Sequence, residues 1–394
     1  MKVKIIDSIC GSGKTSYAIQ MINECSDTGK FIYITPFLDE VERVKKSCDN
    51  FISPQYLGTS KFDHFHKLLI QGKNIVSTHA LFRMATQETK DLIEGNGYTL
   101  ILDEVMDVLE ELPLRKNDLP TILSTGLAHK DENDFLIWDQ SDYDGRYNDV
   151  KTMCENKSIF VVNDCCLMWT FPIEVFESFS EVYVLTYMFS SQLQRYYYDL
   201  YDLPYEYYRV QKKDCGYTLV SHDGTVDVFN GKINIYYGSM NNIGDGTYDL
   251  SVGWYDKHKY TKVKILKNNI YNYFFNVVRS KGKYNLWTTF SDYESKLRGK
   301  GYTSGFLAHN SRSTNNYIGK TTIAYCVNKF ISPMVVHFFK SKGVTIDQDK
   351  YALSELIQFV WRSAIRRNQE INIYIPSKRM RNMLEVYTSE CKVH

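Results

Sequence analysis

Apolar residues in the first half of the chain fall into short runs that are separated by longer amphipathic stretches. The runs have the length of strands, and the stretches between them have the length and periodicity of helices. Strands and helices that alternate in this way form a parallel sheet with helices on its faces. The predicted strands of this half are Val3–Ser8, Phe31–Thr35, Asn74–Ser77, Thr99–Leu102, Ser158–Val162 and Val182–Thr186.

The pattern changes twice before the end of the chain. Glu111–Asn156 is polar and partly acidic, and we interpret it as a surface excursion. From Tyr217 to Lys264 short alternating strands are separated by hairpin signals at 222–224 and 230–231, which predicts a small β-rich insertion. Helices and strands then alternate again, with strands predicted at Tyr284–Phe290, Gly305–His309 and Ile371–Ile375. The chain is therefore predicted to be α/β, with two α/β units that flank a β insertion.

Composition excludes several classes of protein. The 394 residues are 43% hydrophobic and 24% charged, as in a soluble globular protein, and the formal net charge of +1 argues against a uniformly basic polyanion binder. The nine cysteines include no Cys-x-x-Cys pair, so we expect free thiols in a reducing compartment. Asp7 comes too early for a signal peptide, and no apolar run approaches the roughly 20 residues of a membrane span. We expect an intracellular protein without a membrane partner.

A phosphate-binding loop follows the first predicted strand. The sequence there is Ser8-Ile9-Cys10-Gly11-Ser12-Gly13-Lys14-Thr15-Ser16, a P-loop in which Ser8 replaces the first glycine. Gly11 and Gly13 allow backbone N–H groups to turn toward phosphate oxygens at a helix N-terminus. Lys14 is predicted to contact the β- and γ-phosphates, and the hydroxyl of Thr15 to ligate Mg²⁺. The predicted nucleotide-binding residues are Gly11, Ser12, Gly13, Lys14, Thr15 and Ser16.

A second acidic motif completes the predicted hydrolytic site. The buried strand Thr99–Leu102 runs into Asp103 and Glu104. Asp103 is expected to hold Mg²⁺ together with Thr15, and Glu104 to polarise the attacking water. These two motifs predict an enzyme that hydrolyses ATP with Mg²⁺ as its cofactor.

A distant basic stretch indicates what hydrolysis could drive. If residues 354–367 form one helix, Gln358, Arg362 and Arg366 share a face at intervals of four residues. An arginine from a second domain can neutralise the charge that develops on the γ-phosphate, which couples hydrolysis to domain closure. Whether Arg362 or Arg366 is this arginine finger stays open at this point.

The order of these motifs resembles superfamily 2 helicases of the DEAD/DEAH-like type. The segments similar to motifs I, Ia, Ib, II, III and VI are Ser8–Ser16, Thr35-Pro36, Ser77-Thr78-His79, Asp103-Glu104, Leu185-Thr186-Tyr187 and Gln358–Arg366. More closely, Val184–Phe189, Asn310–Asn315 and Ile375–Arg381 look like phage-encoded helicase-family proteins. The sequence departs from the pattern at Tyr187, where a small residue is usual, and no adenine-reading motif precedes the P-loop.

The resemblance implies an architecture and a partner. It implies two tandem RecA-like domains, at 1–195 and 265–394, with a linker and β-rich insertion at 196–264, and with ATP between the domains. It also implies a tracked single strand of nucleic acid, DNA rather than RNA, and a monomer in the cytoplasm of a bacterial host. The residues that would contact this strand are Thr35, Pro36, Thr78, His79, Asn310, Arg312, Thr314 and Asn315.

The function predicted from these residues is that of an ATP-dependent helicase or translocase in phage replication, recombination or repair. A nucleic-acid-stimulated ATPase that remodels complexes without unwinding would use the same residues. A packaging motor with a C-terminal nuclease would need clustered carboxylates, and few acids follow Arg366. A small-molecule or nucleoside kinase would not need the Gln358–Arg366 segment.

Overall fold

The computed structural model describes residues 2–25, 29–58, 60–155, 157–222, 229, 231–310 and 316–390. The chain forms two compact units, which are treated separately below. The first unit is Met1–His222 with Ser332–Ile346, and the second is Asp223–Ile331 with Asp347–His394. Over the described ranges, none of the helices combines the length and the apolar character needed to cross a membrane.

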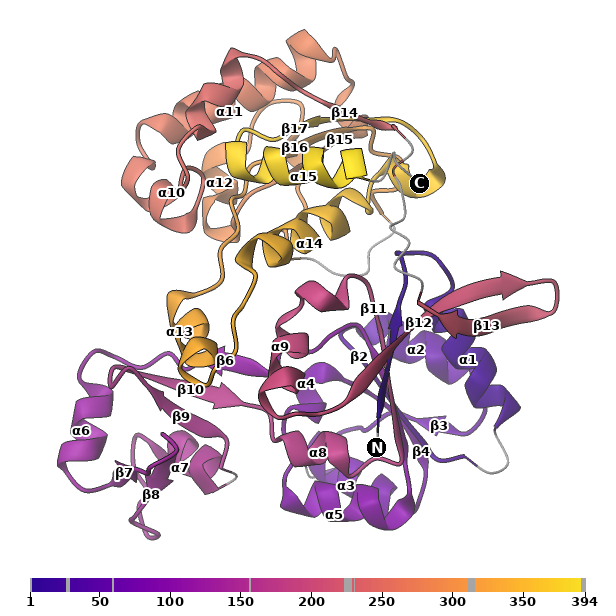
Figure 1. Cartoon of the computed structure of the whole chain (residues 1–394), viewed down its shortest axis with the longest axis vertical. Helices are drawn as coiled ribbons and strands as arrows, with labels where there is room; N and C mark the ends of the chain where they lie inside the picture. The colour runs from indigo at the N-terminus through magenta and orange to yellow at the C-terminus, as the bar shows by residue number, and fades with distance from the viewer. Residues whose placement is uncertain are drawn as a thin grey trace. The chain divides into compact units, whose positions relative to one another are not determined.

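The first unit is built on an eight-stranded sheet in which every strand but the edge strand β13 pairs in parallel (Figure 1). The strand order is β13-β12-β1-β11-β5-β2-β4-β3. The strands are β1 (Val3–Asp7), β2 (Phe31–Thr35), β3 (Phe51–Ile52), β4 (Asn74–Thr78), β5 (Thr99–Asp103), β11 (Glu181–Thr186), β12 (Tyr205–Lys213) and β13 (Gly216–Ser221). The α-helices between them are α1 (Lys14–Glu24), α2 (Leu38–Ser47), α3 (Lys61–Ile70), α4 (His79–Phe82), α5 (Gln87–Asn96), α8 (Ile173–Glu177) and α9 (Leu193–Leu200).

The central strands are buried on both faces, which explains why they appear in the sequence as continuous apolar runs. On one face Ile6, Tyr33 and Ile101 pack against Ala18 and Ile22 of α1, together with apolar residues of α2. The alternate residues of the same strands are also fully buried: Ile5, Ile32, Ile34, Leu100, Leu102 and Val184. Five of the six predicted strands of this half lie in this sheet within one residue of the predicted ends.

The predicted segment 196–264 is divided between the two units and does not form a body of its own. Its first part continues the first sheet, because β12 pairs in parallel with β1 and β13 pairs antiparallel with β12. Its later part contributes β14 (Ile233–Ile235) to the sheet of the second unit. Residues 223–228 and 230, which fall within the predicted β-rich insertion, lie outside the described residues.

The β-rich insertion instead lies inside the first unit, between β5 and β11. It contains the antiparallel sheet β6-β10-β9 and the hairpin β7-β8. The predicted parallel strand Ser158–Val162 is therefore antiparallel β9, and the predicted surface excursion Glu111–Asn156 contains helices and strands of this insertion. Its elements are β6 (Leu109–Glu111), α6 (Asp118–Ser124), β7 (Ala128–Lys130), β8 (Leu136–Trp138), α7 (Asn148–Glu155), β9 (Ile159–Val162) and β10 (Cys166–Thr170).

A helix from much later in the chain packs on this insertion. The helix is α13 (Pro333–Ser341), and its buried Phe338 ring meets Phe160 of β9 edge-on at 5.2 Å between centroids. Just after α13, Lys342 donates to the Asp134 carboxylate at 2.8 Å, and Ser332 at its N-cap donates to Glu111 at 2.9 Å. These contacts explain why 332–346 belongs to the first unit.

The second unit has a four-stranded parallel sheet in the order β14-β17-β16-β15 (Figure 1). Besides β14, the strands are β15 (Asn285–Thr288), β16 (Thr322–Tyr325) and β17 (Ile371–Tyr374). Its α-helices are α10 (Val252–His258), α11 (Lys262–Asn272), α12 (Glu294–Leu297), α14 (Gln348–Val360) and α15 (Lys378–Glu390). The predicted strand Gly305–His309 is wrong, because Phe306 makes only an isolated bridge to Trp287.

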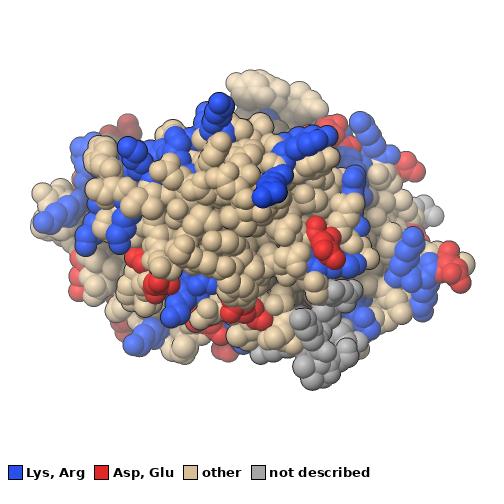
Figure 2. All heavy atoms as spheres, turned by 90° about the horizontal axis from the view of Figure 1, so that it is seen from above, with Lys and Arg blue, Asp and Glu red and all other residues tan. Residues whose placement is uncertain are grey.

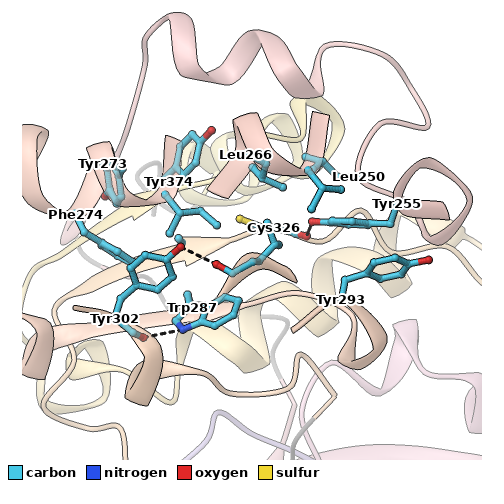
Figure 3. Close-up of a cluster of buried hydrophobic side chains, with 14 of the residues drawn as sticks. Leu250, Tyr255, Leu266, Tyr273, Phe274, Trp287, Tyr293, Tyr302, Cys326 and Tyr374 are labelled. Atoms are coloured by element: carbon cyan, nitrogen blue, oxygen red, sulfur yellow. Dashed lines mark hydrogen bonds between the residues drawn. The ribbon is translucent and has the colours of Figure 1, made fainter. Parts of the chain in front are cut away.

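The core of this unit is largely aromatic, and several of its polar atoms form hydrogen bonds inside it (Figure 3). The buried indole of Trp287 donates to the carbonyl oxygen of Tyr302 at 2.9 Å. The buried hydroxyl of Tyr255 donates to the carbonyl oxygen of Cys326 at 2.7 Å. Such hydrogen bonds offset the cost of burying the polar atoms of tyrosine and tryptophan. The many tyrosines of the sequence are therefore used here mainly for packing.

Candidate nucleotide site

The loop between β1 and α1 has the backbone of a phosphate-binding loop. Gly11 and Gly13 have φ angles of 89° and 98°, in the left-handed region that favours glycine. Gly13 is the N-cap of α1, and its carbonyl oxygen accepts the N–H of Tyr17 at 2.8 Å. The loop therefore ends at a helix N-terminus, where unpaired N–H groups and the helix dipole favour an anion.

The side chains of this loop fit a bound polyphosphate. Lys14 is 8% exposed, and its ammonium group donates to the carbonyl oxygens of Ser8 at 2.5 Å and Ile9 at 3.0 Å. The lysine thus lies folded over its own loop. The hydroxyl of Ser12 is buried, with no hydrogen-bond partner among the described residues. An ammonium and an unsatisfied donor in a loop of glycines are the groups that phosphate oxygens need.

The P-loop and the acids Asp103 and Glu104 lie at one edge of the first sheet because its strands end level with one another. Asp7 at the end of β1 pairs with Thr186 of β11, and Leu185 of β11 pairs with Asp103 of β5. Further along the same edge, Thr35 of β2 pairs with Thr78 of β4. The carboxyl edge of an open parallel sheet is where such folds bind ligands.

Asp103 lies in a buried environment that changes its acidity. Burial and the neighbouring charge of Glu104 raise the pKa of Asp103 to about 7, and the hydroxyl of Tyr33 donates to its carboxylate at 3.0 Å. A buried carboxylate costs free energy when it is charged, and a cation beside it offsets that cost. This environment fits the predicted role of Asp103 in holding Mg²⁺. Glu104 follows with φ of 67°, so the chain turns sharply away after Asp103.

Asp7 has a structural role that the sequence analysis missed. Its carboxylate accepts the N–H of Met188 at 2.8 Å and the N–H of Phe189 at 2.9 Å, 181 and 182 residues away. Burial raises the pKa of Asp7, and these two hydrogen bonds act in the opposite direction. The bonds fix the turn after β11, in which Met188 has φ of 55°. The only signal in the sequence was an acidic residue directly before the P-loop. Its hydrogen-bond partners could not be predicted, because they are distant in sequence.

Two buried threonines lie on the same edge. The hydroxyls of Thr35 and Thr186 are fully buried and have no hydrogen-bond partner within the described part of the chain. Pro36, Thr78 and His79 follow at the ends of β2 and β4, and each is partly exposed. Together with Thr35, they are the predicted nucleic-acid contacts of the first domain. In the second unit Asn310 is exposed, while Arg312, Thr314 and Asn315 lie outside the described residues.

The segment from Gln358 to Arg366 differs from the prediction of one continuous helix. Helix α14 ends at Val360, and Ser363 then caps a short 3₁₀ turn, Ala364–Arg367. The hydroxyl of Ser363 donates to the carbonyl oxygen of Val360 at 2.6 Å and so competes for the backbone of the last helical turn. The three predicted residues therefore do not share one helix face. Arg362 is buried, and Arg366 is exposed.

Solved structures share this fold. Two structures of XPD, one described as the helicase and one as the apo form, match 99% and 98% of the chain with TM-scores of 0.50 and 0.51 and 9% identity. Xpd4 of S. tokodaii matches all of it with a TM-score of 0.50 and 11% identity. The matches cover 94–95% of those chains. The protein thus has the tandem RecA-like fold of superfamily 2 helicases, as predicted.

Sequence comparison identifies the family. Residues 227–388 match the YonV C-terminal Rossmann-like domain, and residues 109–169 match the YonV middle domain. The SPbeta prophage-derived protein YonV of Bacillus subtilis (strain 168) is 45% identical over 402 residues, which is 97% of this chain and 98% of that protein. The chain belongs to the YonV family. The family's middle domain coincides with the insertion of the first unit, so the insertion lies within the first RecA-like domain and not between the two.

The hydrogen bonds of Asp7 lead to a testable prediction. In Asp7→Asn the amide keeps one acceptor but places an NH₂ group against the second N–H, so one buried hydrogen bond is lost. We expect amide hydrogen exchange at Met188 and Phe189 to become about 10-fold faster or more, since a lost hydrogen bond of about 1.4 kcal/mol gives this factor. Asp107→Asn, at an exposed position, is the matched control. Equal exchange in both variants would show that Asp7 does not hold this turn.

Proposed function

We propose that this protein is an ATP-dependent helicase or translocase that hydrolyses ATP with Mg²⁺ and moves along or unwinds DNA. The observation that carries the proposal is the meeting of the P-loop with Asp103 and Glu104 at one edge of a RecA-like sheet. The fold is that of helicases, and the 45% identical relative from a prophage supports a phage setting. We infer from this setting a location in the bacterial cytoplasm and a role in replication, recombination or repair.

Each residue of the site has a distinct role in this proposal. Lys14 leaves its loop carbonyls and binds the β- and γ-phosphates of ATP, which the N–H groups of the loop also hold. Thr15 and Asp103 would hold Mg²⁺, whose charge would offset that of the phosphate oxygens. Glu104 orients the attacking water and takes its proton. We assign the arginine finger to Arg366 and not to Arg362, because a finger needs an accessible guanidinium, and Arg366 is exposed whereas Arg362 is buried.

The distribution of charge supports nucleic acid as the partner. The second unit has 23 Lys and Arg against 13 Asp and Glu, a formal charge of +10. The whole chain is +1, which leaves −9 for the first unit. Eleven of the basic residues lie between Lys257 and Lys300, where Asp292 and Glu294 are the only acids. Figure 2 shows a face on which Lys and Arg outnumber Asp and Glu. Such a surface attracts phosphate backbones.

An exposed aromatic ring lies within this basic stretch. Tyr260 is 81% exposed, the largest value among the exposed large hydrophobic residues described. The ammonium groups of Lys259 and Lys296 lie 5.2 and 5.4 Å from the centre of its ring. A ring that can stack on an unpaired base, flanked by cations that can contact the adjoining phosphates, fits single-stranded nucleic acid. We therefore add Tyr260 to the proposed contacts at Thr35, Pro36, Thr78, His79, Asn310, Arg312, Thr314 and Asn315.

The central test is ATP turnover with and without nucleic acid. We expect single-stranded DNA to stimulate hydrolysis more than RNA does, and Lys14→Ala to abolish turnover because the phosphates lose their main cation. Release of phosphate measures both, and circular dichroism checks that the variant is folded. Undiminished turnover in Lys14→Ala would overturn the P-loop assignment.

The same assay separates the alternatives. Stimulation by DNA without strand separation in a fork-unwinding assay would indicate a translocase that remodels complexes. Hydrolysis that no nucleic acid stimulates would contradict the helicase proposal and favour a kinase-type activity. DNA cleavage would be required of a packaging motor with a nuclease domain.

The assignment of the finger gives a second prediction. Arg366→Ala should lower kcat by about 10³-fold, because the finger stabilises charge that develops only in the transition state, while the Kd for ATP changes little. Arg367→Ala, at the next exposed position, is the control and should keep its kcat. A selective loss of kcat in Arg362→Ala would transfer the role to Arg362. Equal loss of kcat and affinity in Arg366→Ala would point to a structural role.

Tyr260 gives a third prediction. Tyr260→Ala should weaken binding of labelled single-stranded DNA about 10-fold in the absence of nucleotide, because stacking on one base is worth about 1–3 kcal/mol. Tyr248→Ala is the matched control, since Tyr248 is 71% exposed and packs on Phe330. Fluorescence anisotropy measures both Kd values. Unchanged affinity in Tyr260→Ala would remove Tyr260 from the nucleic-acid surface.

A further inference from the structure

The hairpin β12–β13 reaches past the end of β1 and lies beside the phosphate loop. Strand β12 pairs with β1 from Val3 to Ile6, and the last of these pairs is Ile6 with Tyr208. Strand β12 continues to Lys213, and the backbone N–H of Val210 donates to the hydroxyl of Ser8 in the loop at 3.0 Å. The middle of strand β12 is thus anchored at the nucleotide site, on the side of β1 opposite β11.

Helix α1 holds the second strand of this hairpin in place. The side-chain amide of Gln20 accepts the N–H of Tyr217 at 2.8 Å and donates to the carbonyl oxygen of Tyr217 at 3.3 Å. The preceding Gly216 has φ of 133°, and a Cβ there would lie 2.6 Å from Oε1 of Gln20. The close approach of Gln20 to this backbone therefore requires a glycine. These contacts fix the position from which the Tyr217 side chain extends.

The ring of Tyr217 lies directly on the phosphate loop. A Cβ added to Gly13 would be 2.2 Å from Cε1 of Tyr217, so the ring rests against the backbone of Gly13. Gly13 is also the N-cap of α1 and directly precedes Lys14. Tyr217 is only partly buried, so part of the ring is accessible beside the loop.

The direction of a bound nucleotide follows from the order of the strands. Asp103 and Glu104 lie on and after β5, which is separated from β1 by β11. The γ-phosphate must point toward these acids, so the base leaves the loop on the other side of β1. That side is formed by β12 and β13.

We propose that Tyr217 is a base-binding residue of the nucleotide site, on which the purine of the nucleoside triphosphate stacks. The proposal rests on the proposed ATPase function, and it gives the base a partner that lies 203 residues after Lys14 in the sequence. Gln20 is a positioning residue, since it acts through the backbone of Tyr217. A tyrosine ring offers a π-face to any base, so this contact supplies affinity for a base in general.

The experiment compares ligands with and without a base. Isothermal titration calorimetry on the full chain would give the Kd of ATP, ADP and inorganic tripolyphosphate for the wild type and for Tyr217→Ala, Tyr217→Leu and Tyr217→Phe. We expect the Ala and Leu variants to weaken ATP and ADP about 10-fold, with tripolyphosphate unchanged because it has no base. Tyr217→Phe keeps the π-face and should bind ATP within about twofold of the wild type.

Two results would overturn the proposal. One is unchanged affinity for ATP in both Tyr217→Ala and Tyr217→Leu. The other is an equal loss for ATP and tripolyphosphate, which would mean that Tyr217 only supports the phosphate loop. Failure of the ATPase proposal looks different, because ATP would then bind equally well to the wild type and to Lys14→Ala. The Leu variant retains apolar bulk, so the test does not depend on whether the Ala variant folds.

Discussion

The register of five parallel strands is the constraint on which the proposed chemistry depends. Strands β1, β11, β5, β2 and β4 end level with one another, which brings the P-loop and the acid of β5 to the same edge. Successive side chains on a strand point to opposite faces, so a shift of one residue would turn Asp103 away from the loop. The apolar residues that fill both faces of these strands fix this register. The same packing that stabilises the first unit therefore aligns its site.

Unusual backbone conformations then direct the groups at this edge. Glu104 and Met188 have left-handed backbone angles although neither is glycine. Glu104 directly follows β5, and Met188 comes two residues after the end of β11. Such conformations cost free energy and persist where the surroundings enforce them, often at functional sites. At Met188 the Asp7 carboxylate provides that support through two backbone hydrogen bonds. At Glu104 the backbone N–H donates to the carbonyl oxygen of Leu185 at 2.9 Å.

The two units differ in net charge, and the chain passes between them more than once. The net charge of +1 conceals a first unit of −9 and a second unit of +10, so the whole-molecule average gave no sign of a basic partner surface. The chain also returns from the second unit to place α13 on the middle domain, where Phe338 and Lys342 hold it. That domain is therefore secured by a helix that follows it by about 160 residues in sequence.

The sequence by itself determined the parts of this protein that depend on local pattern. Most strands of the first sheet were predicted correctly, and the glycine loop and the acids Asp103 and Glu104 lie at the strand ends where the pattern put them, because glycine positions and continuous apolar runs report local conformation and burial. Pairing between distant segments was decided only by the tertiary structure. It makes β9 antiparallel, places the middle domain inside the first RecA-like domain, and brings Tyr217 onto Gly13. It also ends α14 at Val360, where the hydroxyl of Ser363 competes for the helix backbone. Each of these outcomes depends on which distant segment of the chain a strand, helix or side chain packs against. An apolar or aromatic residue shows in the sequence that it will be buried, but it does not show which segment will cover it.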